Sequence, residues 1–341
     1  MRVDDFDFEL PPEAIAQEPR PRGESRLLRL AAAGAARHRR VADLPEILRP
    51  GDLLVLNDTR VIPSRLFGKR AAGGGEVEVL LVEPAPGGDA RRWIALTKPG
   101  RKTRVGAAVE FPGLAAEVEQ VREDGSRIVL FSEDPWPHLE RLGHMPLPPY
   151  IERGDTAADR ERYQTVYSAK AGAIAAPTAG LHFTREILGA LVERGVETTT
   201  LTLHVGLGTF KPMKAERVAD HVMEAERYEV PEAAAAAVER TRARGGRVVA
   251  VGTTATRTLE TVAAGEGLIS PGSGRTALFI TPGFEFRVVD ALLTNFHLPR
   301  STLLLLVSAF AGREAILAAY AEAIEEGYRF YSYGDAMLLE R

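Results

Sequence analysis

The sequence contains no cysteine, and this absence removes several classes of protein at once. Without thiols there is no disulfide framework, no thiolate zinc or iron–sulfur site and no cysteine nucleophile. Long apolar runs are missing as well, because the longest, residues 303–310, is far shorter than the roughly 20 residues that a membrane helix needs. The N-terminal residues are acidic and lack the basic start and apolar middle of a secretory signal. We therefore expect a cytoplasmic protein with no membrane partner.

Motifs for metals and nucleotides are equally scarce. The seven histidines show no His-x-x-x-His spacing, and no EF-hand or Walker pattern occurs. Gly206 and Gly208 form a Gly-x-Gly turn without the third glycine of a dinucleotide fingerprint. A Gly-x-Ser-x-Gly elbow is missing too, so an α/β-hydrolase would have no nucleophile. The sequence predicts no metal site.

The composition is typical of a soluble globular protein, with 341 residues of which 45% are apolar and 26% charged. A chain of this length buries about 75% of its extended surface and most naturally forms two domains. Its net charge of −4 argues weakly against a nucleic-acid partner, but the charge is unevenly spread. Residues 60–104 hold ten basic and four acidic side chains. Most basic residues are arginine, which binds phosphate through two hydrogen bonds, although an arginine-rich genome or heat adaptation would also explain this preference.

The apolar pattern changes twice along the chain. Residues 1–62 and 151–341 alternate apolar strands with helical segments, which is typical of a layered α/β domain. Residues 63–150 instead show short strands separated by Gly/Pro or Asp-Gly turns and predict a small barrel. The simplest fold is a barrel-like α/β main domain, built from both ends of the chain and interrupted by an inserted all-β barrel-like domain. The basic surplus lies largely on the insertion.

Polar residues follow the predicted strands at five places, where an α/β sheet binds its ligands. The candidate residues at these strand ends are Asn57, Asp58, Arg60, Thr178, Gly180, His182, His204, Gly206, Gly208, Thr209, Phe210, Thr253, Thr254, Asn295 and His297. Each histidine alone is well explained as a core or surface residue. Three histidines at similar strand ends favour a common site.

Two further groups could bind a charged ligand. Thr253 and Thr254 open a predicted helix that carries Arg257 one turn on, and the free backbone amides there suit a carboxylate or phosphate. The alternative is a helix cap at Thr254 and an arginine on the surface. Near the C-terminus, the aromatic segment 328–333 is followed by Asp335. This cluster suits a cation or a nucleobase, or is a packed terminal segment.

Longer motifs resemble a known family over essentially the whole chain. They are the segments 143–151 (GHMPLPPYI), 163–167 (YQTVY), 175–183, 203–210, 251–254, 294–299 and 328–337. In this order they closely resemble the S-adenosylmethionine:tRNA ribosyltransferase-isomerase family of queuosine biosynthesis. One position departs from that pattern. Where the resemblance predicts His-x-Met-His-x-Glu, residues 221–226 read HVMEAE, so Glu224 replaces the second histidine.

The resemblance implies a reaction and its substrates. The ribosyl moiety of S-adenosylmethionine would be transferred and isomerised onto 7-aminomethyl-7-deazaguanine at the wobble position of tRNA, giving epoxyqueuosine with release of adenine and methionine. S-adenosylmethionine would be a consumed cosubstrate, with no metal or other cofactor, and we expect a monomer. A sulfonium acidifies the neighbouring 5′ methylene, so a general base of modest strength suffices. The candidates for this base are His182, His204 and Asp335.

The other candidates would bind the substrates. We expect Thr253, Thr254 and Arg257 to hold the methionine carboxylate or a tRNA phosphate, and Tyr331 or Tyr333 to face the sulfonium. Because the anticodon has to reach the strand ends, the cleft between the two domains is the expected site. Basic residues of the inserted domain would contact the tRNA backbone, and those we select are Arg101, Lys102 and Arg104.

Two other classes of protein remain as alternatives. A non-catalytic RNA-binding scaffold would explain the basic insertion but not five polar strand ends in an acidic α/β domain. A methyltransferase would use the same cosubstrate, but the glycine-rich loop expected after a first strand is missing. The reaction products distinguish the two enzymes, since S-adenosylhomocysteine indicates methyl transfer and adenine plus methionine indicates ribosyl transfer.

Overall fold

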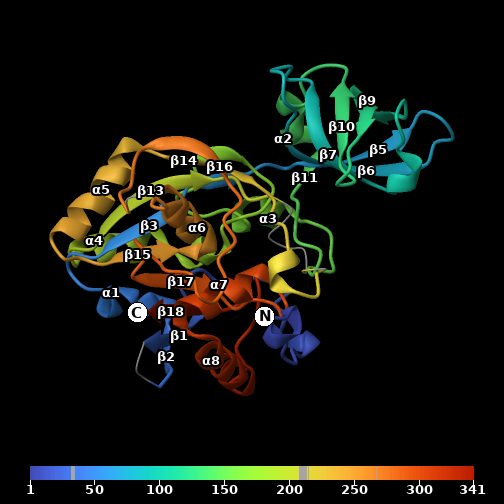
Figure 1. Cartoon of the computed structure of the whole chain (residues 1–341). Helices are drawn as coiled ribbons and strands as arrows, with labels where there is room; N and C mark the ends of the chain where they lie inside the picture. The colour runs from blue at the N-terminus through green and yellow to red at the C-terminus, as the bar shows by residue number, and fades with distance from the viewer. Residues whose placement is uncertain (32–34, 207–212, 214, 266) are drawn as a thin grey trace.

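The computed structural model describes residues 1–31, 35–206, 213, 215–265 and 267–341. These residues form a large main body of sheet and helices and a separate small barrel, seen at the upper right of Figure 1. Both termini lie on the main body (Figure 1). Three predicted site residues lie outside the described residues: Gly208, Thr209 and Phe210.

The barrel consists of six antiparallel strands that close on themselves. Its hydrogen-bonded order runs β5, β6, β7, β10, β9, β8 and back to β5. The strands are β5 (Arg65–Arg70), β6 (Glu76–Pro84), β7 (Arg92–Lys98), β8 (Ala108–Phe111), β9 (Leu114–Val121) and β10 (Arg127–Phe131), with β11 (Gly143–His144) beside β5. Residues of β9 are buried in alternation over its first half, as a strand with one face turned inward requires. The predicted all-β barrel is confirmed.

The described part of the main body contains a mixed sheet of nine strands. In hydrogen-bonded order these strands are β16 (Gly272–Thr276), β14 (Glu226–Val230), β13 (Glu197–Leu203), β3 (Leu53–Asn57), β15 (Val248–Val251), β17 (Ala291–Asn295), β18 (Ala336–Glu340), β1 (Arg26–Ala31) and β2 (Arg37–Arg40). β3 is parallel to both β13 and β15, and β15 is parallel to β17. The carboxyl ends of these four strands therefore meet at one edge of the sheet, where α/β proteins bind ligands.

Helices cover both faces of this sheet, so its central strands are buried throughout. One face, which includes Leu54 and Val249, packs against α1 (Leu44–Ile47) and α4 (Arg185–Glu193). The other face packs against the longer helices, which are α5 (Glu232–Ala243), α6 (Gly252–Val262), α7 (Thr302–Ala311) and α8 (Arg313–Glu325). α2 (Leu139–Leu142) packs on the barrel, and the segment that returns to the main body carries α3 (Ala157–Arg162). The predicted layered α/β arrangement is confirmed, but the barrel-like form predicted for the main domain is wrong, because its sheet is open, with β16 and β2 at the two edges among the described strands.

Two short apolar segments that have the pattern of strands differ in the structure. Residues 278–280 (LFI) have no regular structure, and the strand in this region is β16. Residues 172–176 (GAIAA) overlap only partly with β12 (Lys170–Ala173), which pairs with β4 (Thr59–Val61) outside the main sheet. The strand β18 was not predicted, because its neighbours β1 and β17 are distant in the sequence and no local pattern marks the pairing.

Among the described residues, no single helix combines the length and apolar character needed to cross a bilayer. Only α7 and α8 taken together have the required length and apolar character, and these two helices are bent by 113° at the break between them.

Candidate active site at the strand ends

Asn57 ends β3 and holds the neighbouring strand ends together. Its Nδ2 donates to the Leu203 carbonyl (3.0 Å) and to Thr254 Oγ1 (3.1 Å). Its Oδ1 accepts from the backbone amides of Leu203 (3.0 Å) and Thr59 (3.1 Å). An amide side chain offers two hydrogens and two lone pairs, and all four are used at this position. Asn57, predicted to bind a substrate, therefore holds the strand ends in place with all of its side-chain hydrogen bonds.

A cavity opens between the ends of β13, β15 and β17, and we call it the inner pocket. Four of the five predicted strand-end segments contribute to its wall. Among the described residues that line it there is no aspartate, glutamate, lysine or arginine. Its apolar wall includes Val205, Phe296 and Leu303. The predicted site residues that it brings together are Thr178, Thr253, Thr254, Asn295, His297 and Tyr331.

Asn295, at the end of β17, is 2% exposed and is held by two neighbours. Its Nδ2 donates to the Tyr331 carbonyl (3.0 Å) and to His182 Nε2 (3.2 Å). Because a carbonyl oxygen only accepts, the amide presents its NH2 group on this side, and His182 Nε2 acts as an acceptor. Asn295 Oδ1 is buried and has no hydrogen-bond partner in the described part of the chain. Asn295, which lines the inner pocket, thus has a buried acceptor that no described residue satisfies.

The histidines around the inner pocket are neutral. His182 is buried, and its Nδ1 lies 3.0 Å from Ser25 Oγ, so both ring nitrogens have partners. Burial lowers the pKa of His182 to about 4. His297 lies with Nε2 2.9 Å from Thr294 Oγ1, and burial lowers its pKa to about 3. Neither ring carries a charge at neutral pH.

Tyr331 has a backbone φ of +76°, a region that non-glycine residues seldom occupy. Its carbonyl accepts from Asn295, and its ring lies against that of Tyr150 with the centroids 3.8 Å apart. A strained backbone of this kind persists only where the surroundings enforce it, and such positions cluster at functional sites. The strain supports the inner pocket as part of an active site.

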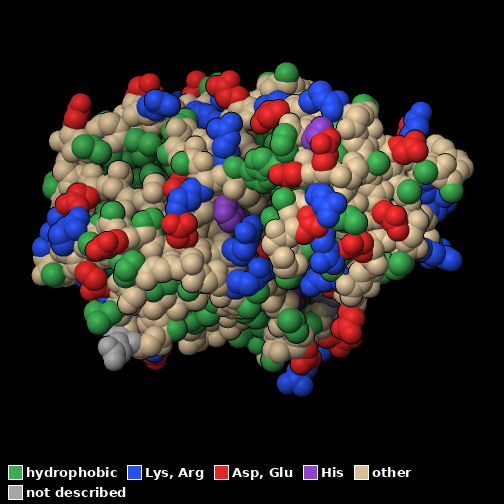
Figure 2. Space-filling view, turned by 90° about the horizontal axis from the view of Figure 1, so that it is seen from above, with side chains coloured by type: hydrophobic (Ala, Val, Ile, Leu, Met, Phe, Trp, Pro, Cys, Tyr) green, Lys and Arg blue, Asp and Glu red, His purple; other side chains and the backbone are tan. Residues whose placement is uncertain are grey.

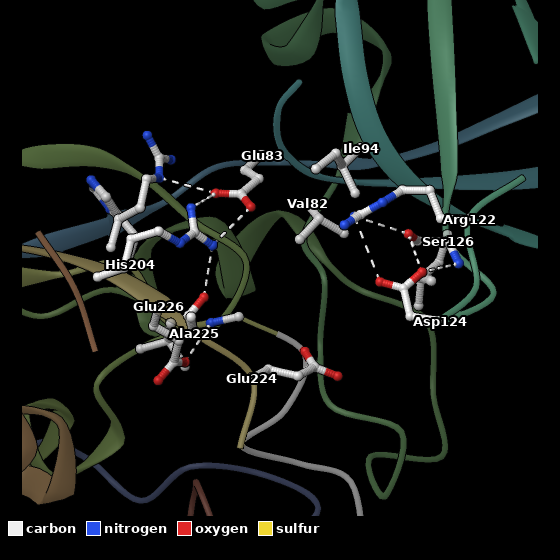
Figure 3. A pocket seen from close by; sticks show the side chains of 16 residues that line it. Val82, Glu83, Ile94, Arg122, Asp124, Ser126, His204, Glu224, Ala225 and Glu226 are labelled. Atoms are coloured by element: carbon white, nitrogen blue, oxygen red, sulfur yellow. Dashed lines mark hydrogen bonds and ion pairs between the residues drawn. The ribbon is translucent and has the colours of Figure 1, made fainter. Parts of the chain in front are cut away.

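A second cavity, which we call the outer cleft, lies between the barrel and the main body (Figure 3). The barrel contributes Glu83, Ile94 and Arg122 among others, and the main body contributes His204 and Val205 among others. Val205 also lines the inner pocket, so the two cavities adjoin just beyond the end of β13. In contrast to the inner pocket, the outer cleft is lined by charged groups of both signs.

His204 follows β13 and lines the outer cleft (Figure 3). Its Nδ1 lies 2.8 Å from Thr59 Oγ1, which in turn donates to the Lys170 carbonyl (3.5 Å). With Thr59 Oγ1 donating to that carbonyl, its lone pair is placed to accept from Nδ1–H, and this tautomer leaves a lone pair on Nε2. Gly172 packs on the ring, and a Cβ there would lie only 2.9 Å from it. Burial first, and Arg227 second, lower the pKa of His204 to about 4, so the ring is neutral at pH 7.

Arg257 does not present its charge to the strand ends. Its guanidinium forms an ion pair with Glu226 in which both side chains are 4% exposed, and its Nε donates to the Leu278 carbonyl (3.0 Å). Glu226 also accepts from the Gly206 amide through Oε1 (2.8 Å). The charge of Arg257 is thus neutralised inside the protein. Arg257, predicted to bind an anion, is instead paired internally, and Glu226 links it to the segment that carries Gly206.

Two carboxylates that were predicted as site residues, Asp335 and Asp58, also accept hydrogen bonds from other parts of the protein. Asp335 is buried, and its oxygens accept from the backbone amides of Arg26 and Arg329, each at 2.9 Å, and from an arginine side chain at 3.2 Å. Asp58 accepts from Thr202 Oγ1 at 2.6 Å. Neither lines the inner pocket or the outer cleft. The lone pairs of Asp335 are engaged by donors from the N-terminal segment, Arg20 and Arg26, and from Arg329 near the C-terminus.

Other predicted residues lie beside the cavities. The hydroxyl of Tyr333 donates to Asp159 Oδ1 (3.1 Å) rather than facing the inner pocket. Gly180 packs under Tyr167, whose hydroxyl would be 2.1 Å from a Cβ at that position. Arg60 is exposed on β4, outside both cavities. Among the described residues, no group of histidine and carboxylate side chains is arranged to hold a metal ion.

The basic side chains of the barrel differ in how far they are neutralised. Acidic and basic groups are interspersed over the face seen from above (Figure 2). Several barrel arginines pair with nearby carboxylates, namely Arg65 with Glu78, Arg91 with Asp89 and Arg92 with Glu119. Arg101, Lys102 and Arg104 are exposed, and they form no ion pair within the part of the chain that the structure describes.

Residues 100–104, the loop that carries these three cations, are held by Arg127. Arg127 Nη2 donates to the Gly100 carbonyl (2.8 Å) and Nε to the Thr103 carbonyl (3.4 Å), while Nη1 donates to Gly125. Gly125 belongs to the turn after β9 whose neighbouring residues line the outer cleft. The loop that carries the three unneutralised cations is therefore tied by Arg127 to a turn of the cleft wall.

Nearly the entire chain is similar to known proteins. The model of the family described as "Queuosine biosynthesis protein" covers residues 3–339. The chain belongs to this family. Two curated relatives, from Gloeobacter violaceus and Moorella thermoacetica, are each 56% identical over 99% of this chain and 95% and 100% of theirs. Both are named S-adenosylmethionine:tRNA ribosyltransferase-isomerase.

A solved structure of the same kind is also similar. The crystal structure of S-adenosylmethionine tRNA ribosyltransferase from Thermotoga maritima shares 40% identity with this queuosine biosynthesis protein. The match covers 98% of this chain and 99% of that one, with a TM-score of 0.56. The resemblance drawn from the motifs is confirmed.

Within the queuosine biosynthesis family, Glu224 is the position where this chain departs from our expectation of a histidine. The side chain lines the outer cleft (Figure 3). This chain therefore offers a carboxylate, and not an imidazole, at that part of the wall.

Sequence reasoning missed several residues that shape the site. Glu83 of β6 binds Arg227 (3.2 Å) and Arg275 (3.1 Å) across the outer cleft, joining the barrel to the main body (Figure 3). Thr59 and Ser25 hold the imidazoles of the two strand-end histidines. No local signal marks these residues, because each acts on a partner more than a hundred residues away in the chain.

Proposed function

We propose that this chain is an S-adenosylmethionine:tRNA ribosyltransferase-isomerase. It transfers and isomerises the ribosyl moiety of S-adenosylmethionine onto 7-aminomethyl-7-deazaguanine at the tRNA wobble position, and the products are epoxyqueuosine, adenine and methionine. The observation that carries the proposal is the meeting of four strand-end segments at two adjoining cavities, in a chain that matches the family over residues 3–339. Adjoining cavities suit a small substrate and a nucleotide that react with each other.

The reaction sets three requirements for the protein. The sulfonium makes its 5′ methylene acidic, so a base removes a proton and forms an ylide. Adenine then leaves, and the primary amine of the deazaguanine attacks. The chain has to supply a proton acceptor near the sulfonium, a site for the purine and an open path for the wobble nucleotide.

Of the three candidate bases, His204 is the one with an available lone pair. His182 uses Nε2 to accept from Asn295, and the oxygens of Asp335 accept three hydrogen bonds. His204 lines the outer cleft, and its lowered pKa of about 4 keeps Nε2 deprotonated at neutral pH. We assign the general base to His204 and positioning roles to His182 and Asp335.

The two parts of the chain have different tasks in this proposal. Residues 1–62 and 151–341 carry the chemistry, and residues 63–150 contact tRNA. The exposed cations Arg101, Lys102 and Arg104 beside the outer cleft support this division, since the anticodon loop has to lie there for its wobble base to reach His204. The protein is expected to act as a cytoplasmic monomer and to use S-adenosylmethionine as a consumed substrate, without a resident metal or cofactor.

Reversing the charge of Arg101, Lys102 and Arg104 to glutamate is expected to weaken tRNA binding and to flatten its salt dependence. Three lost phosphate contacts remove about 2 to 3 from the slope of log K against log salt concentration. Filter binding at several salt concentrations measures this slope.

The matched control reverses Arg37, Arg39 and Arg40, three exposed arginines of β2 at the opposite end of the molecule from the barrel (Figure 1). It changes the net charge by the same amount and should leave the slope as it is in the wild type. A barrel variant with the wild-type slope would argue against tRNA contact by this loop.

The experiment that tests the function is incubation of the protein with S-adenosylmethionine and precursor tRNA. We expect adenine and methionine to be released only when the tRNA carries 7-aminomethyl-7-deazaguanine, and mass analysis of the nucleosides to show epoxyqueuosine. Formation of S-adenosylhomocysteine would indicate a methyltransferase instead. Binding of tRNA without purine release would indicate a scaffold.

A further inference from the structure

The uncharged lining of the inner pocket restricts which part of a substrate can enter it. In the described part of its wall, the polar side-chain groups are hydroxyls, the Asn295 amide and the neutral imidazole of His297, and the backbone amides that open α6 also lie on this wall. An ammonium would lose its hydration there without meeting an opposite charge, and a carboxylate or phosphate would meet only these uncharged amides and no cationic side chain. The outer cleft has Arg122, Arg227 and Glu224 on its wall. The charged part of a substrate therefore fits the outer cleft, and a neutral ring fits the inner pocket.

The side chain of Asn295 determines which hydrogen-bonding edge of a neutral ring can face it in the inner pocket. The hydrogens of its Nδ2 go to the Tyr331 carbonyl and to His182 Nε2, which leaves Oδ1 buried without a partner in the described chain. A buried acceptor without a partner is costly, so a ligand that donates an N–H to Oδ1 is favoured. A ligand that places an acceptor there is rejected. The Tyr331 carbonyl prevents the amide from rotating to present its NH2 group instead.

Of the two purines in the proposed reaction, adenine matches this edge. Its exocyclic 6-amino group is the one donor of the free ring edge, and Asn295 Oδ1 is a buried side-chain acceptor of this wall that has no partner among the described residues. The deazaguanine has donors at two neighbouring positions, a cationic aminomethyl arm and the phosphates of its tRNA. The uncharged wall provides no counterpart for these charges among its described residues.

Resting on the function proposed above, we propose that the inner pocket is the purine subsite for S-adenosylmethionine, and that Asn295 Oδ1 accepts a hydrogen bond from the adenine 6-amino group. His182 is then a positioning residue, because its Nε2 holds the Asn295 amide. The ribose lies at the junction of the two cavities beside Val205, and the sulfonium faces the outer cleft, where His204 is the adjacent residue in the chain.

The test compares S-adenosylmethionine with its 6-oxo analogue, S-inosylmethionine, in which a carbonyl acceptor replaces the amino donor. With precursor tRNA, the wild type is expected to favour S-adenosylmethionine by at least about 100-fold in kcat/KM for purine release, because two acceptors would otherwise face each other. In Asn295→Ala this ratio is expected to fall below about 10, since the discriminating acceptor is gone.

The matched control is Asn57→Ala. Asn57 is an equally buried amide at a neighbouring strand end, but it does not line the inner pocket. Its loss should lower the rates with both substrates and leave their ratio unchanged. A ratio that collapses in both variants would indicate a general structural effect and overturn the role of Asn295 as the reader of the amino group.

A wild-type ratio below about 3, or an unchanged ratio in Asn295→Ala, would also overturn the proposal. Calorimetric binding of free adenine and hypoxanthine to the wild type tests the subsite without requiring turnover or a folded variant. Adenine binding without hypoxanthine binding is expected, and equal binding of the two, or none, counts against the subsite. A wild type that releases no adenine from S-adenosylmethionine refutes the proposed function, and the calorimetric result still decides the subsite by itself.

Discussion

Replacement of His204 by alanine is expected to lower tRNA-dependent adenine release about 100- to 10,000-fold, the effect typical of losing a general base. The expectation rests on the lone pair of Nε2, since Nδ1 is bonded to Thr59 Oγ1 and the ring lines the outer cleft. Because the side chain packs against Gly172 and not against the main hydrophobic core, the variant should keep its fold. Initial rates of adenine release at saturating tRNA measure the effect.

The pKa of His204 adds a second signature. Burial lowers it to about 4, so the base remains deprotonated as the pH falls until that value is approached. The pH profile of adenine release should therefore show an acid-side break near 4 and no break near the ordinary histidine pKa of about 6.5. A break near 6.5 that disappears in His204→Ala would contradict the buried, neutral state of this imidazole.

His38→Ala is the matched control for the rate. This histidine lies on β2, away from both cavities, and bonds Tyr328 and Glu322. Its replacement should change the rate by less than about twofold, as is usual for surface substitutions. If His204→Ala retained a rate similar to that of His38→Ala, the base would have to be another group.

Replacement of Glu226 by alanine is expected to lower the free energy of unfolding by about 3–5 kcal/mol, because it leaves the Arg257 charge buried without its partner. Both side chains of this ion pair are 4% exposed. The same change removes the acceptor of the Gly206 amide, so activity should fall together with stability. Urea unfolding followed by circular dichroism measures the change.

Two further variants separate charge from packing. The double variant Glu226→Leu/Arg257→Met replaces the whole pair with apolar groups and should recover most of the lost stability, since no lone charge remains buried. Glu197→Ala removes the half-exposed partner of Arg244 and should cost less than about 1 kcal/mol. Equal losses of unfolding free energy in Glu226→Ala and Glu197→Ala would show that the buried ion pair contributes no more to stability than the exposed one.

The strand-end motifs illustrate how far local reasoning extends. The sequence placed His182, His204 and His297 at comparable positions and could not rank them. In the structure, His182 has partners on both nitrogens, His297 bonds Thr294, and His204 keeps a lone pair beside the outer cleft. The distinction depends on partners supplied by other segments, so the same residue type has different chemistry at each place.

Arg257 shows a partner that the local motif did not reveal. Threonines at a helix start followed by an arginine one turn on suit an anion, but Glu226 from β14 already neutralises the arginine. The sequence contains Glu226 without any sign of this pairing. Asn295 was predicted as a binding residue, yet only its two hydrogen bonds reveal which of its atoms is left for a ligand.

By itself, the sequence determined the layered α/β main body, the inserted barrel, the family and the segments that surround the site. These features are encoded locally, because apolar periodicity, Gly/Pro turns and long motifs can be read within a few neighbouring residues. Only the tertiary structure decided which polar atoms remain available for chemistry. The atoms that satisfy His182, His204 and Arg257 lie 157, 145 and 31 residues away in the chain, and a hydrogen bond or ion pair forms only after folding brings such groups together.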